Sequence, residues 1–142
     1  MPRTHLVVVN DGHNLQSGLE YACETFPEDT IVAIYVDTAS SGVAPIHLDE
    51  EGGSVDDWLD AHRAEADRAF DAARAVAADH DVDVETVVAF GGFADAIRQY
   101  CSNNPIDTVI VGCRDRDAFS SYIVGDDVTR IANTAPVPVV VV

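Results

Sequence analysis

The chain has 142 residues, and its 25 acidic and eight basic side chains give a formal net charge of −17 at pH 7. This length suits one domain with a sizeable core, so we predict a single domain over residues 1–142. A uniformly acidic surface repels nucleic acid backbones and anionic membranes, which excludes both as partners, and no apolar run reaches the roughly 18 residues that a membrane span needs.

The first half of the chain predicts two strands separated by a helix. Residues 5–10 (HLVVVN) and 30–36 (TIVAIYV) are nearly continuous apolar runs, as expected for strands of a parallel sheet that are buried on both faces. Between them, apolar residues recur with a helical period until Pro27 ends the helix. The residues on that helical face are Leu15, Leu19, Ala22 and Phe26.

The second half continues the alternation after an irregular segment at 38–54, a loop long enough to be a candidate partner surface. We predict a helix from Ser54 to about His80 and a shorter one around 94–101, which ends before Pro105. Their apolar faces are formed by Leu59, Ala66, Phe70, Ala73 and Ala77, and by Ala94, Ile97 and Cys101. Strands are predicted at 82–90, 107–112 and 137–142.

This order of elements predicts an α/β fold with one open five-stranded parallel sheet and helices on both faces. In such sheets ligands bind outside the carboxyl ends of the strands, at the point where the strand order reverses. A strand followed by a glycine turn and a helix N-terminus offers backbone N–H groups to an anion, and the stretch 109–142 has that arrangement.

The stretch 109–142 resembles the signature of the universal stress protein family, in which Gly-x-x-Gly, a spacer and Gly-Ser or Gly-Thr precede a final strand led by Ala-Pro-x-Pro. The first glycine is Gly112, the third is Gly125, and Ala135 to Pro138 supply the last element. The resemblance extends over nearly the whole chain. It implies a Rossmann-like sheet in the order 3-2-1-4-5, with the ligand between the first and fourth strands.

The resemblance also implies the residues that would hold ATP, and two of them differ from the family's pattern. Asp115 stands in place of the second glycine and Asp126 in place of the Ser or Thr. A carboxylate near a helix start accepts hydrogen bonds from the N–H groups that phosphate would use. By position the nucleotide-binding residues would be Asp11, Val36, Gly112, Arg114, Asp115, Gly125, Asp126 and Asp127.

We therefore predict a stress-response binding and interaction module with weak or absent ATP binding and no required cofactor. The alternative is an ATP- or AMP-binding universal stress protein with slow, metal-dependent ATP hydrolysis, in which Asp115 shares a metal with phosphate. Cys113 has two readings, a small residue and a thiol activated by Arg114 or Arg116.

The residues that other functional classes of α/β protein require are absent from this sequence. A response-regulator receiver needs a lysine, and the chain has none. A dinucleotide-binding enzyme needs Gly-x-Gly-x-x-Gly after the first strand, and a flavin carrier needs a Ser/Thr-rich loop there; both are absent. The five histidines have no metal-ligand spacing. We predict no catalytic residues and no metal site, and hence a protein that is not an enzyme.

The last strand is apolar and lies at an edge of the predicted sheet, where unpaired edges invite pairing. In the family this strand pairs across a two-fold axis, which implies a homodimer through Pro138, Val139, Val140, Val141 and Val142. A further protein partner is expected.

The three cysteines have unrelated spacings, and the N-terminus shows no secretion signal, so we expect a cytoplasmic protein. The lysine-free, acid-rich composition looks like an adaptation to a very salty cytoplasm. At ~1 M salt the screening length is only about 3 Å, so repulsion between exposed carboxylates nearly vanishes. We expect the fold to lose stability when KCl is lowered.

Overall fold

The structure is a computed structural model that describes residues 2–10, 12–37, 55–112 and 129–142, with the backbone alone at 12–15 and 55–62. The strands found there are β1 (Thr4–Val8), β2 (Thr30–Asp37), β3 (Val84–Phe90), β4 (Thr108–Val111) and β5 (Val139–Val141). They form one sheet in the order β3-β2-β1-β4-β5, and all neighbouring strands are parallel. The predicted fold class and strand order are confirmed.

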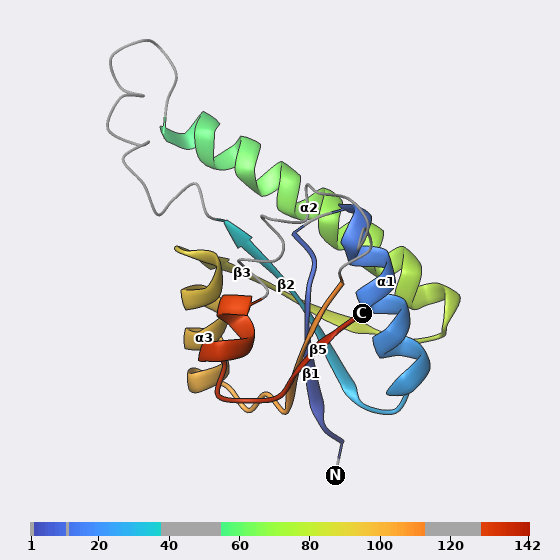
Figure 1. Cartoon of the computed structure of the whole chain (residues 1–142). Coiled ribbons are helices and arrows are strands. Elements are labelled where there is room, and N and C mark those ends of the chain that lie inside the picture. The colour runs from blue at the N-terminus through green and yellow to red at the C-terminus, as the bar shows by residue number, and fades with distance from the viewer. Residues whose placement is uncertain (1, 11, 38–54, 113–128) are drawn as a thin grey trace.

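Helices cover both faces of this sheet. Figure 1 shows α1 (Gly12–Thr25) and α2 (Val55–Asp79) together on one face and α3 (Phe93–Asn103) on the other, beside a short helical segment at 129–134. The helix faces predicted from the sequence are buried where side chains are described, except at Phe26, which is half-buried and follows the end of α1. Those buried side chains are Leu19, Ala22, Ala66, Phe70, Ala73, Ala77, Ala94, Ile97 and Cys101.

Two hydrophobic cores result, one on each side of the sheet, and β1 contributes to both because alternate side chains point to opposite faces. Val7 and Val9 pack with α1 and α2, while Leu6 and Val8 pack with α3. Ile131, from the segment 129–134, is fully buried in the second core. Each helix layer is therefore held by its own apolar cluster.

The third strand begins later than predicted, at Val84 instead of residue 82. The chain first completes the end of α2, where the Val82 main-chain N–H donates to the Ala77 carbonyl at 2.9 Å. Asp81 has a left-handed φ of 55°, a conformation that commonly ends helices. Val82 is buried, so its apolar character reflects helix termination and not a strand.

The amino-terminal edge of the sheet holds a buried histidine that the sequence did not single out. His5 is fully buried, and its Nε2–H donates to the Asp29 carboxylate at 2.8 Å. The imidazole also stacks on Phe26, with ring centroids 3.8 Å apart. The His5 Nδ1 has no hydrogen-bond partner within the described residues. This contact ties β1 to the connection between α1 and β2.

The Asp29 carboxylate makes this edge sensitive to acid. The hydrogen bond from His5, with a smaller contribution from the Arg3 main-chain N–H, holds the pKa of Asp29 below its ordinary value of 3.8. A carboxylate with a lowered folded pKa stabilises the protein fully above the unfolded pKa, and that contribution is lost as the pH falls through the folded pKa.

We predict that Asp29→Asn lowers the free energy of unfolding at neutral pH and that its difference from the native protein shrinks below about pH 4. Urea unfolding across the acid range, in molar KCl, measures this difference. Asp71→Asn, which removes an exposed carboxylate on α2, should leave the native pH profile unchanged. A native–Asp29→Asn difference that stays constant to low pH would contradict the assignment.

Candidate functional site

The candidate site is the carboxyl-terminal edge of the sheet where the strand order reverses, which we call the switch edge. From β1 the chain passes through α1 to β2 on one side, whereas β4 lies on the other side of β1. Parallel α/β sheets bind ligands at this edge, because strand ends and helix N-termini meet there. The described residues at the ends of the three strands are Val9, Asn10, Val36, Asp37 and Gly112.

Asn10 joins the end of β1 to the end of β2 through its side chain. The main-chain ladder continues as far as the Val9 N–H, which donates to the Ile34 carbonyl at 3.0 Å. Beyond it, the Val36 N–H donates to Asn10 Oδ1 at 2.7 Å, and Asn10 Nδ2 donates to the Val36 carbonyl. A carboxamide supplies one acceptor and two donors, so this one side chain satisfies both main-chain groups of Val36.

Gly18 sets how closely α1 approaches the end of β4. A Cβ added at Gly18 would lie 3.2 Å from the main-chain nitrogen of Gly112 and 3.6 Å from the Val7 side chain. Both glycines are buried. The missing side chain therefore lets the helix pack directly on the backbone where the predicted anion-binding loop begins.

Two of the eight residues predicted to bind nucleotide lie in the described part of the chain. Val36 and Gly112 are buried at the switch edge, on opposite sides of β1. Asp11, Arg114, Asp115, Gly125, Asp126 and Asp127 lie outside the described residues, as do Cys113 and the loop 38–54.

Sequence reasoning missed Asn10. Its signal was a polar residue at the last position of an apolar run, immediately before a turn, a position from which a side chain can reach the neighbouring strand. Asp37, at the end of β2, is also buried, with 5% of its surface exposed. This part of the edge therefore contains a carboxylate and a carboxamide, with no lysine or arginine among its five described residues.

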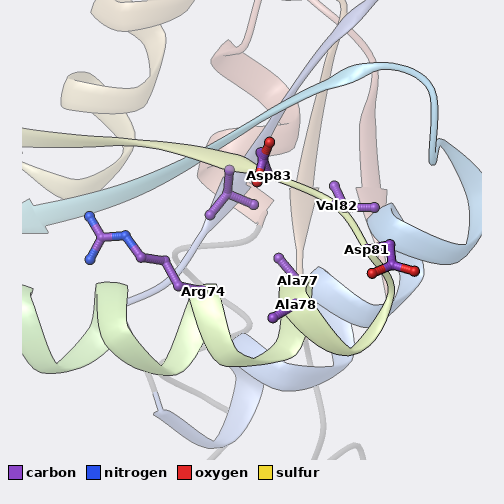
Figure 2. Close-up of a pocket in the computed structure, with 7 residues that line it drawn as sticks. Arg74, Ala77, Ala78, Asp81, Val82 and Asp83 are labelled. Carbon is purple, nitrogen blue, oxygen red and sulfur yellow. The ribbon is translucent and has the colours of Figure 1, made fainter.

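A groove of about 570 Å³ lies elsewhere, between the end of α2 and the start of β3. Figure 2 shows Arg74 and Asp81 toward its two ends, with Ala77, Ala78 and Val82 between them. It is at the amino-terminal end of β3, the edge opposite Asn10 and Gly112. The groove is therefore separate from the candidate site.

Among the described residues, no cluster of three or more His, Cys, Asp or Glu side chains is placed to hold a metal ion. None of the described helices combines the length and the hydropathy needed to cross a membrane. Cys23 and Cys101 are free and buried, and burial raises the pKa of both thiols. A raised pKa leaves less of the nucleophilic thiolate at neutral pH.

A model of the universal stress protein family matches residues 1–142. Among similar solved structures, universal stress protein UspA from Lactobacillus plantarum has a TM-score of 0.73 and 22% identity, covering 100% of this chain and 99% of that one. A family protein from Arabidopsis thaliana with AMP bound has a TM-score of 0.67 and 18% identity, covering 99% of this chain and 91% of that one. The universal stress protein from Archaeoglobus fulgidus in complex with dAMP has a TM-score of 0.65 and 13% identity, covering 99% of this chain and 97% of that one. A search of curated proteins finds no match.

The Gly18–Gly112 contact yields a prediction about the geometry of the switch edge. Gly18→Val should lower the free energy of unfolding by about 2 kcal/mol, because the added groups overpack α1 against main-chain atoms. It should also shift the Gly112 amide resonance in a ¹⁵N-resolved NMR spectrum. Gly92→Ala is the control, since a Cβ there meets nothing nearer than 3.6 Å. An unchanged Gly112 resonance in Gly18→Val would show that the contact does not position this loop.

Proposed function

Because the chain belongs to the universal stress protein family, we propose that it is a cytoplasmic stress-response binding and interaction module that binds Mg-ATP weakly or not at all. The observation that carries this proposal is the reciprocal Asn10–Val36 pair. It occupies, with the chain's own side chain, main-chain groups that a ligand at the switch edge would use. In this proposed function the protein is not an enzyme and requires no cofactor.

Electrostatics supports the same proposal. A triphosphate carries several negative charges, and its binding needs free N–H groups or cations. This chain has a net charge of −17 and a buried acidic residue, Asp37, at the switch edge. Asp115 and Asp126, identified from the sequence, would add carboxylates where the family has glycine and Ser or Thr.

A second candidate function is nucleotide binding, with slow metal-dependent ATP hydrolysis. It is favoured by the solved structures of similar fold that contain AMP and dAMP. Both ligands carry one phosphate, which makes a smaller electrostatic demand on an acidic protein than ATP does. The two functions differ in whether the native chain binds Mg-ATP.

We predict that isothermal titration calorimetry in molar KCl detects no tight binding of Mg-ATP to the native protein. The Asp115→Gly/Asp126→Ser double variant keeps the Asn10–Val36 pair but should bind Mg-ATP more tightly than the native protein, because without these two carboxylates backbone N–H groups are available to phosphate. Asp67→Asn/Asp71→Asn removes two exposed carboxylates on α2 and is the charge-matched control. Micromolar binding by the native protein would contradict the proposal and would make hydrolysis the next activity to assay.

We also propose a homodimer joined through the last strand. Among the described strands, β5 pairs only with β4, so its other edge carries unpaired main-chain groups. Pro138 and Val141 are exposed there, Val141 at 41%. Two copies related by a two-fold axis would pair these edges through the same residues on each protomer.

Light scattering in molar KCl tests the dimer. Val141→Lys is expected to give a monomer, because a charge on an edge strand blocks pairing. Val88→Lys is the matched control, since Val88 is equally exposed, at 41%, on the opposite edge strand β3. A native protein that is monomeric would end the proposal.

A further inference from the structure

We propose that the open edge of β3 is a docking site for an extended segment of a partner protein, in which apolar and basic residues alternate. The segment pairs with β3 as an added strand of the sheet. The inference rests on the proposed interaction function and names the chemistry of the partner. It concerns the edge of the sheet opposite β5, so that docking and the proposed dimer use different strands.

The first observation is that alternate residues of β3 turn their main-chain groups away from the sheet. Among the described strands, β3 pairs with β2 alone. The Gly91 N–H, directly after β3, donates to the Asp37 carbonyl of β2 at 3.2 Å. Successive residues of a strand direct their main-chain groups to opposite sides. Thr86, Val88 and Phe90 are therefore the residues whose N–H and C=O groups point outward.

The same residues carry apolar side chains that the fold leaves exposed. Val84 packs with the core on the α2 side of the sheet and Val87 with the core on the α3 side. Because side chains alternate between the faces of a strand, Val88 and Phe90 are on the α2 side. They are 41% and 58% exposed. Outward main-chain groups and exposed apolar side chains on one edge strand fit the addition of a further strand.

The groove between α2 and β3 continues this surface toward the start of the strand. Val84 contributes to its lining, so the groove is on the same side of the sheet as Val88 and Phe90. Ala77 and Ala78 of α2 have short side chains, which leave the space of about 570 Å³ beside the chain that leads into β3 (Figure 2). In strand addition, main-chain pairing supplies affinity and pockets for alternate side chains supply specificity. The groove is such a pocket.

Charge determines the other face of the added strand. Glu85 is exposed on the α3 side of β3, and Asp81 and Asp83, just before the strand, are exposed as well. Arg74, which lines the groove, already lies 3.4 Å from the Asp71 carboxylate. The start of this edge therefore has an excess of carboxylates. A segment with lysine or arginine on its α3 side and apolar residues on its α2 side is complementary to both faces.

A second copy of this chain fits the edge less well. Two β3 strands related by a two-fold axis would bring two acidic edges together, and like charges on paired strands are destabilising. In an assembly already joined through β5, pairing at β3 as well would extend the sheet from dimer to dimer without closure. A partner of complementary charge avoids both consequences.

The experiment titrates synthetic peptides with blocked ends into the ¹⁵N-labelled native protein in molar KCl. The probe peptide alternates valine and lysine and has the length of β3, 7 residues. One control peptide has glutamate in place of lysine. The other has the composition of the probe, with its valines and its lysines in separate blocks. Molar salt screens the attraction of the peptides to distant carboxylates, so the titration measures contacts at the edge.

The probe should shift the amide resonances of Val88 and Phe90. It should also slow hydrogen exchange at the outward amides of Thr86, Val88 and Phe90. Exchange at Val87 and Ala89, whose amides face β2, should stay as it was. Both control peptides should bind more weakly than the probe. No shift at Val88 and Phe90 with millimolar probe would overturn the inference.

Three variants separate strand pairing from simple adsorption. Thr86→Pro removes an outward N–H but keeps both exposed apolar side chains and the ladder to β2, and it should weaken probe binding about fivefold or more. Val88→Lys should also weaken binding, because its charge repels the lysines of the probe. Val141→Lys, at the equally exposed position on β5, is the matched control and should bind the probe like the native protein. Native affinity in Thr86→Pro would overturn the inference.

Two other occupants of the edge give recognisable results in the native protein without the probe, and these results do not depend on whether a variant folds. Outward amides of Thr86, Val88 and Phe90 that are already protected would show that the chain covers its own edge. A species larger than a dimer in light scattering, lost in Val88→Lys, would show that a second copy does. Either result would overturn the inference. Tight Mg-ATP binding or a monomeric native protein would refute the proposed function instead, and would leave probe binding at β3 unchanged.

Discussion

The burial of β1 on both faces is the constraint on which the rest of the structure depends. This strand lies between β2 and β4 in the sheet, and a helix layer covers it on each face. None of the four apolar residues from 6 to 9 is more than 6% exposed: Leu6, Val7, Val8 and Val9. No polar side chain is tolerated along such a stretch without a partner. Polar chemistry is consequently confined to its two ends, and the ends are where His5 and Asn10 lie.

Side chains complete the hydrogen bonding of the sheet where the main chain departs from it. At the amino end Asp107 accepts from the Thr4 N–H at 2.8 Å, and at the carboxyl end Asn10 serves both groups of Val36. An unpaired buried main-chain group costs about 1–3 kcal/mol, which accounts for the partners of the buried Val36. At the switch edge both main-chain groups of Val36 therefore have a partner within the chain.

The acidity of the chain and the local bonds at the site act on different length scales. In molar salt the repulsion between a nucleotide and distant surface carboxylates is screened within a few ångström. Carboxylates and carboxamides in direct contact with the binding atoms are not screened in this way. In molar salt, the proposed weak binding of ATP therefore rests more on a few side chains at the strand ends than on the net charge of −17.

The sequence by itself determined the fold class, the parallel sheet, the buried helix faces and the family. Continuous apolar runs indicate buried strands and a helical apolar period indicates the buried face of a helix, so each element can be predicted separately. The glycine motif likewise identifies one loop. It placed Val36 and Gly112 at the switch edge through the family's strand order. Only the tertiary structure decided which distant residues touch: His5 with Asp29, Asn10 with Val36, and Gly18 with Gly112. These contacts depend on strand register and on where each strand ends, and a periodic pattern contains neither.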